Sequence, residues 1–191
     1  MITSDIHDAF SVPIYRGNVS DFDLIQTELE SCIKDMDFNM VTEWGSTHYL
    51  SDSKFKNNLI LDFNLEKFSN EVDIHVNKYI SKIGFPKTNY KIISSWFALF
   101  RRGNYAHIHN HGDCDIAGVY YFKKSGNDGN LFFCTPNKAE DTSFIFNSRR
   151  IVTNCKEGEI LLFPGFLDHG VQTNDTDDER VSLSFNIYFD R

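Results

Sequence analysis

The sequence predicts an α+β protein in which N-terminal helices pack outside a jelly-roll core. Helical periodicity is confined to the first half of the 191-residue chain, and short alternating segments separated by turn signals fill the second half. The composition agrees, because 18 Phe and 8 Tyr beside only 4 Pro favour half-buried pleated surfaces. We therefore expect a single domain over residues 1–191, with a helical part at 1–89 and a β-core at 90–191.

Two amphipathic helices are expected before residue 90. The first covers residues 21–36, where apolar side chains recur every three or four positions and Ser20 can serve as the N-cap. The second covers residues 65–83 and can end at Gly84. The polar, turn-rich stretch 42–52 between them predicts a loop over the mouth of the fold.

The second half of the chain predicts a series of short strands. We expect them at Tyr90–Phe100, Tyr105–His111, Ile116–Lys123, Asn130–Cys134, Ser143–Phe146, Ile151–Cys155, Glu159–Phe163, His169–Gln172 and Val181–Phe189. Turn signals such as Ser125–Gly129 and Pro164-Gly165 separate most of them. Short strands at even spacing are typical of a sandwich or barrel rather than a parallel βαβ sheet.

Charge and cysteine usage narrow the class of protein. The net charge is −8 and no basic stripe is present, so we expect no nucleic-acid partner. The 4 cysteines are widely spaced without a C-x-x-C pair, which predicts free thiols in a reducing cytoplasm. We see no signal peptide and no apolar run long enough to span a membrane, so a soluble protein is expected.

A cluster of histidines predicts a metal site. His107, His109 and His111 alternate, so on a strand all three side chains would share one face, although His107 also fits a position behind the metal ligands or on the surface. Some sixty residues later, His169 follows an apolar strand and a Pro-Gly corner. A facial iron site needs two imidazoles and usually one carboxylate, with open positions for other ligands. Two ligands on one strand and a third from a neighbouring strand meet that requirement.

A polar strand face predicts an anion site. Arg180 opens the last strand, and polar residues alternate there with apolar ones. The interior of a barrel is normally apolar, so this face needs a function. The guanidinium of Arg180 can form a bidentate contact with a carboxylate, and the Ser182 hydroxyl lies on the same face.

Together these motifs resemble a known family. They run Phe100-Arg-Arg-Gly-x5-His109-x-His111, Ile116-Ala-Gly-Val-Tyr-Tyr121, Gly158-Glu-Ile-Leu-Leu-Phe-Pro164, His169 and Arg180-Val-Ser-Leu-Ser-Phe-Asn186. The pattern is similar to that of the 2-oxoglutarate/iron(II) oxygenases of bacteria and phages, over roughly residues 90–189. The resemblance implies a double-stranded β-helix, the cofactors Fe(II) and 2-oxoglutarate, and hydroxylation of a C–H bond of an unidentified substrate, with decarboxylation of 2-oxoglutarate to succinate.

The resemblance also implies roles for individual residues. His109 would be the first iron ligand and His169 the distal one, while Arg180 and Ser182 would hold the far carboxylate of 2-oxoglutarate. The wider superfamily uses H-x-D, but here His111 occupies the carboxylate position. Either the site has three histidines, His109, His111 and His169, which we favour, or His111-Gly-Asp113 supplies the H-x-D. Asp115 is a weaker carboxylate candidate on the same face.

Other functional classes remain open from the sequence. The histidine and glycine spacing also approaches that of cupins, which would bind metal, or act as dioxygenases, without 2-oxoglutarate. An inactive scaffold with the same fold is a third reading. The substrate is expected to be a small molecule or a peptide, no membrane partner is expected, and an aromatic-rich strand edge could support a homodimer.

Overall fold

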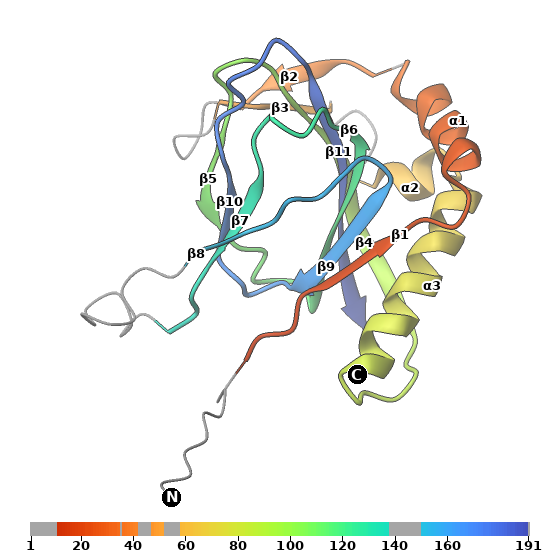
Figure 1. Cartoon of the computed structure of the whole chain (residues 1–191). Coiled ribbons are helices and arrows are strands. Elements are labelled where there is room, and N and C mark those ends of the chain that lie inside the picture. The colour runs from red at the N-terminus through yellow and green to blue at the C-terminus, as the bar shows by residue number, and fades with distance from the viewer. Residues whose placement is uncertain (1–10, 35, 42–46, 52–57, 138–149, 191) are drawn as a thin grey trace, which may run out of the picture.

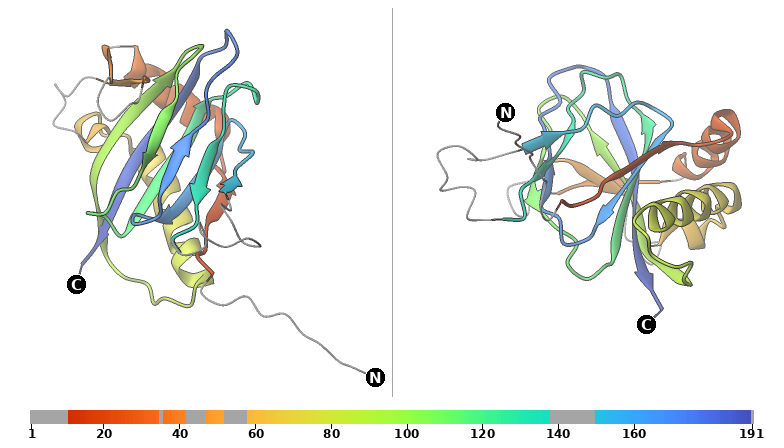
Figure 2. Two further views of the ribbon diagram at one scale, coloured as in Figure 1. Left: turned by 90° about the vertical axis from the view of Figure 1, so that its left-hand side faces the viewer. Right: turned by 60° about the horizontal axis from the view of Figure 1, so that its bottom comes forward.

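Two antiparallel sheets form the protein, a double-stranded β-helix with helices along one side (Figures 1 and 2). The computed structural model describes residues 11–34, 36–41, 47–51, 58–137 and 150–190. The larger sheet has the order β1 (Tyr15–Asn18), β9 (Glu159–Pro164), β6 (Ile116–Lys123), β11 (Arg180–Phe189), β4 (Tyr90–Phe100), β3 (Tyr49–Ser51) and β2 (Phe38–Met40). The smaller sheet has the order β5 (Ala106–His109), β10 (His169–Val171), β7 (Leu131–Cys134) and β8 (Arg150–Val152).

The helices are α1 (Phe22–Ile33), α2 (Leu59–Asp62) and α3 (Glu66–Lys82). The positions expected for the two long helices are confirmed, and Gly84 follows α3 with a φ of 77°, the left-handed conformation that ends many helices. The expected N-cap is wrong by one residue. Asp21 caps α1 by accepting a hydrogen bond from the Leu24 amide, whereas the Ser20 hydroxyl donates to Glu71 of α3. Within the described ranges, no helix has both the length and the apolar character that a membrane span requires.

Three strands before residue 90 were not expected from the sequence. The strand β1 pairs with β9, and β3 pairs with β2 and β4, so the N-terminal part of the chain extends the larger sheet at both edges. Each has three or four residues, too few to show an alternating pattern. The expected loop at 42–52 contains β3, and its residues 42–46 and 52, like the expected strand at 143–146, lie outside the described part.

The faces of β11 show why its sequence alternates. Leu183 and Phe185 are fully buried in the core beneath the helices, together with side chains of α1 and α3. Gly118 lies opposite Phe185 on β6, and a Cβ atom there would come within 2.2 Å of the Phe185 ring. The other face of β11, with Arg180 and Ser182, therefore points into the space between the sheets.

A second, smaller core fills part of that space. It is formed by inward side chains of β6, β7 and β9, among them Tyr121, Phe133 and Phe163. Residues of β4, β5 and β10 form an adjoining apolar cluster that includes Phe100 and Val171. Arg180, Ser182 and His169 thus lie between apolar walls, where water is scarce.

Candidate active site

Three histidines converge between the sheets. One ligand atom of each of His109, His111 and His169 lies within 4.8 Å of the other two, and no other such group occurs among the described residues. His109 ends β5 and His169 begins β10, and the two residues are direct cross-strand partners. His111 lies in the turn beyond β5, where its amide donates to the carbonyl of Gly165 at 2.8 Å. The Pro-Gly corner after β9 thus holds the third histidine beside the other two.

Each of these histidines uses Nδ1 for a hydrogen bond to an oxygen. His109 bonds to the His107 carbonyl at 2.8 Å, and His169 bonds to the Leu167 carbonyl at 2.9 Å. His111 bonds to the side-chain oxygen of Asn186 at 2.7 Å. These oxygens can only accept, so each Nδ1 carries a proton and each Nε2 keeps its lone pair. This is the arrangement that orients metal-binding histidines.

Burial keeps two of the rings neutral. His169 is 3% exposed, and desolvation, reinforced by His109, lowers its pKa to about 3. Desolvation also lowers the pKa of His111 and outweighs the opposing effect of its bond to Asn186. The ring of Phe163 packs 4.8 Å from that of His169 and contributes to the apolar wall. Neutral imidazoles are the form that binds metal, so the protein needs no proton release at these rings to do so.

The donor set suits a transition metal. Imidazole nitrogen binds iron, zinc, copper and nickel well, and coordination at about 2.1 Å requires nitrogens closer together than the 4.8 Å limit found here. Binding a metal would therefore draw the three rings closer together. Three protein ligands leave the remaining coordination positions open, as a reaction centre requires.

The other candidate metal ligands predicted from the sequence do not belong to this group of histidines. Asp113 is exposed in the turn after His111 and does not belong to the cluster. Asp115 accepts a hydrogen bond from the Phe189 amide, which lies beside it at the end of β11. His107 does not share the inner face. The pairing of β5 with β10 shifts between His169 and Val171, and the extra residue turns His107 outward.

Arg180 is buried in the same inter-sheet space, and no described carboxylate forms an ion pair with it. It is 1% exposed, and its guanidinium lies 4.8 Å from the ring centre of Phe100 and 5.4 Å from that of Tyr121. Its Nε and Nη1 have no hydrogen-bond partner in the described part of the chain, and burial lowers its pKa. Buried charges are normally paired. Ser182, also buried, follows on the same face of β11.

The buried carboxylate that acts electrostatically on Arg180, Asp128, already pairs with another cation. Asp128 is fully buried and accepts a bond of 2.5 Å from Lys124, which is also buried. Lys124 donates in addition to the carbonyl of Gly129. Among the described residues, Arg180, Lys124 and Asp128 together give this buried region an excess of one positive charge. An anionic ligand at Arg180 would neutralise it.

Comparison with known families decides the class of protein. A family model described as "Putative 2OG-Fe(II) oxygenase" matches residues 94–186, the segment that contains the three histidines and Arg180. This segment is that of a 2-oxoglutarate/iron(II) oxygenase. The sequence-based assignment to this family is therefore confirmed. No curated protein shows significant similarity to this oxygenase.

Solved structures confirm the fold of the oxygenase. A prolyl-4-hydroxylase from Pseudomonas putida is 13% identical with a TM-score of 0.61, covering 95% of this chain and 94% of that one. An oxidoreductase of the 2OG-Fe(II) oxygenase family from Burkholderia pseudomallei is 12% identical with a TM-score of 0.61, over 85% and 77% of the chains. HygX from Streptomyces hygroscopicus, with nickel and 2-oxoglutarate bound, is 10% identical with a TM-score of 0.62, over 93% and 83%.

Two contributors to the site had no role assigned from the sequence. Tyr121 was part of a motif, but its ring contacts Arg180 and its buried hydroxyl makes no well-directed hydrogen bond to described residues. Asn186 was likewise part of a motif, and it bonds to His111. A local sequence motif can mark such residues, but it cannot show which residue of the opposite sheet each of them contacts.

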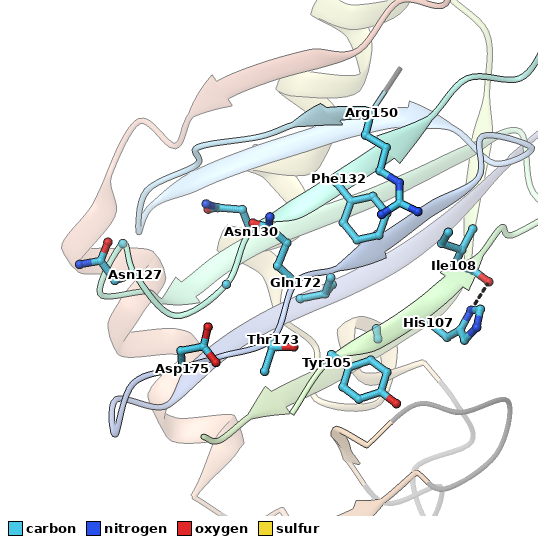
Figure 3. A pocket seen from close by; sticks show the side chains of 14 residues that line it. Tyr105, His107, Ile108, Asn127, Asn130, Phe132, Arg150, Gln172, Thr173 and Asp175 are labelled. Carbon is cyan, nitrogen blue, oxygen red and sulfur yellow. Dashed lines mark hydrogen bonds between the residues drawn. The ribbon is translucent and has the colours of Figure 1, made fainter. Parts of the chain in front are cut away.

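The oxygenase also has a concavity of about 750 Å³ on the outer face of the smaller sheet (Figure 3). His107 and Tyr105 lie at one side of it, and Phe132 lies across from them with Arg150 over its ring at 5.0 Å. The three clustered histidines do not line this hollow. It is therefore separate from the candidate metal site.

Proposed function

We propose that this oxygenase binds Fe(II) through His109, His111 and His169 and hydroxylates a C–H bond of a small molecule or peptide, with decarboxylation of 2-oxoglutarate to succinate. One observation supports this most directly. Three oriented Nε2 atoms and a buried guanidinium with unpaired donors share one space between the sheets. A metal-binding protein of the cupin type has no use for the second of these features.

The chain's own residues perform distinct tasks in this proposal. His109, His111 and His169 would hold Fe(II), which would supply the redox chemistry with dioxygen and the cosubstrate. The Arg180 guanidinium would bind the far carboxylate by charge-assisted hydrogen bonds, with Ser182 beside it, and so orient the cosubstrate toward the histidines. The apolar walls around His169 would exclude water from the reacting groups.

The proposal also covers the class of substrate and the cellular compartment. The net charge of −8 supports a substrate other than nucleic acid. Of the four cysteines, Cys32, Cys114 and Cys155 are buried as thiols, which supports a reducing cytoplasm as the compartment.

An anaerobic titration tests the proposed function. Purified apo-protein is loaded with Fe(II), 2-oxoglutarate is added, and the weak visible charge-transfer band of the chelate is recorded for wild type and Arg180→Met. We expect a band in wild type that needs far more 2-oxoglutarate in the variant. Bound iron without any band would replace the proposal with a cupin-type metal protein, and failure to bind iron would point to an inactive scaffold.

A further inference from the structure

The hydrogen bonds that orient the three histidines differ in kind. His109 and His169 donate to the backbone carbonyl two residues before each of them, so their own chain segments orient them. His111 lies beyond the end of β5 and donates to a side chain, Asn186 of β11, 75 residues away in the sequence. The third ring is therefore oriented from the opposite sheet.

The Asn186 amide is itself held in one orientation. Its Nδ2 donates to the hydroxyl of Ser94 on β4 at 3.0 Å, and the two residues are cross-strand partners. Because Ser94 takes the amide nitrogen, the amide oxygen is left to face His111. The thiol of Cys114 also points at this oxygen, at 3.6 Å. The His111 ring also packs against the ring of Trp96, and the two ring centres lie 5.7 Å apart.

We propose that Asn186, held by Ser94, is a positioning residue for the metal site. It fixes the His111 ring in the tautomer and direction that present Nε2 beside His109 and His169. This inference rests on the proposed function, because it assigns Asn186 a role toward the metal that the histidines would bind. No other side chain of the described residues holds His111 by a hydrogen bond.

The expected effect follows from the position of His111. A side chain on a turn keeps several rotamers unless a partner selects one. Loss of such an outer partner typically weakens metal binding about 10-fold to 100-fold. Arg180 lies six positions earlier on the same face of β11, so the strand would carry the cosubstrate anchor at one end and the ligand holder at the other.

Two substitutions separate hydrogen bonding from packing. Asn186→Leu removes the acceptor at similar volume, whereas Asn186→Asp keeps an oxygen facing the His111 Nδ1–H. Asn58→Leu is the matched control, because Asn58 is a buried asparagine that accepts a hydrogen bond from Ser95, the neighbour of Ser94 on the opposite face of β4. Each protein is prepared metal-free, and Co(II) binding is measured by visible absorption, with thermal unfolding of the apo-proteins recorded alongside.

We expect Asn186→Leu to raise the Co(II) dissociation constant about 10-fold to 100-fold and Asn186→Asp to bind within about threefold of wild type. Asn58→Leu should lower the melting temperature but leave the dissociation constant unchanged. If Asn186→Leu binds Co(II) as tightly as wild type, or if Asn186→Asp is equally weak, the inference is wrong and the proposed function stands. If wild type itself fails to bind Co(II), the proposed metal site is wrong.

Discussion

Arg180→Met should change cosubstrate binding and apo-protein stability in opposite directions. In the protein without ligands, Nε and Nη1 of Arg180 are buried and have no hydrogen-bond partner among the described residues. An unsatisfied buried donor costs about 1–3 kcal/mol, whereas cation–π contacts such as those with Phe100 and Tyr121 contribute about 0.5–2 kcal/mol. Met keeps most of the volume and removes the charge. We therefore expect the variant's apo form to be as stable as wild type or more stable by about 1 kcal/mol, a rise in melting temperature of about 2–4 °C.

The bound state should show the reverse. Truncating one partner of a buried, hydrogen-bonded charge pair costs about 2–5 kcal/mol, so the 2-oxoglutarate dissociation constant of the metal-loaded variant should rise about 30-fold to 5,000-fold. At a ligand concentration about 100 times its dissociation constant, 2-oxoglutarate should stabilise wild type by about 2.7 kcal/mol. The same concentration should stabilise the variant little.

Thermal unfolding of apo and metal-loaded protein, with and without 2-oxoglutarate, measures both effects. Arg16→Met is a matched control, because Arg16 is partly exposed and forms an ion pair of 2.7 Å with Glu159, which begins β9 at the end away from Gly165. That variant should lose some stability and keep the full response to 2-oxoglutarate. A strongly destabilised Arg180→Met that still responds to 2-oxoglutarate as wild type does would show that Arg180 serves the fold and not the cosubstrate.

Three further predictions address the metal site, the packing and the acid stability. His169→Ala should abolish Co(II) binding measured by visible absorption and Asp113→Ala should leave it unchanged; loss of metal in the second variant would restore the H-x-D alternative. Gly118→Ala should lower the unfolding free energy in urea by about 1–3 kcal/mol, because the new Cβ would lie 2.2 Å from the Phe185 ring, and an unchanged midpoint would contradict this packing. Burial lowers the pKa of His48 from 6.5 to about 4, so the unfolded chain takes up a proton first as the pH falls. His48 alone should therefore cost the metal-free protein about 1 kcal/mol of unfolding free energy between pH 7.5 and pH 5.5, in addition to the losses from His169 and His111, whose pKa values burial also lowers. The variant His48→Gln, which cannot titrate, should lose about 1 kcal/mol less than wild type over the same range.

The local patterns of the chain determined much of the architecture. Apolar periodicity located α1 and α3 to within three residues at each end, since that spacing survives only if one helix face is buried. Alternation along β11 placed Arg180 and Ser182 on one face and Leu183 on the other, because consecutive strand residues point to opposite sides. The motifs then identified the family, which the family model confirms.

Other features were decided only by the tertiary structure. His107 and His109 are two residues apart, so simple alternation would put both side chains on one face of β5. The bulge between β5 and β10 turns His107 outward, because an extra residue in one strand reverses the alternation at that point. The turn after β5 brought His111 into the cluster and left Asp113 in solvent, since the carbonyl of Gly165 holds the His111 amide. These contacts join segments that are far apart in the sequence. A local sequence pattern therefore cannot predict which side chain of a distant strand will form the contact.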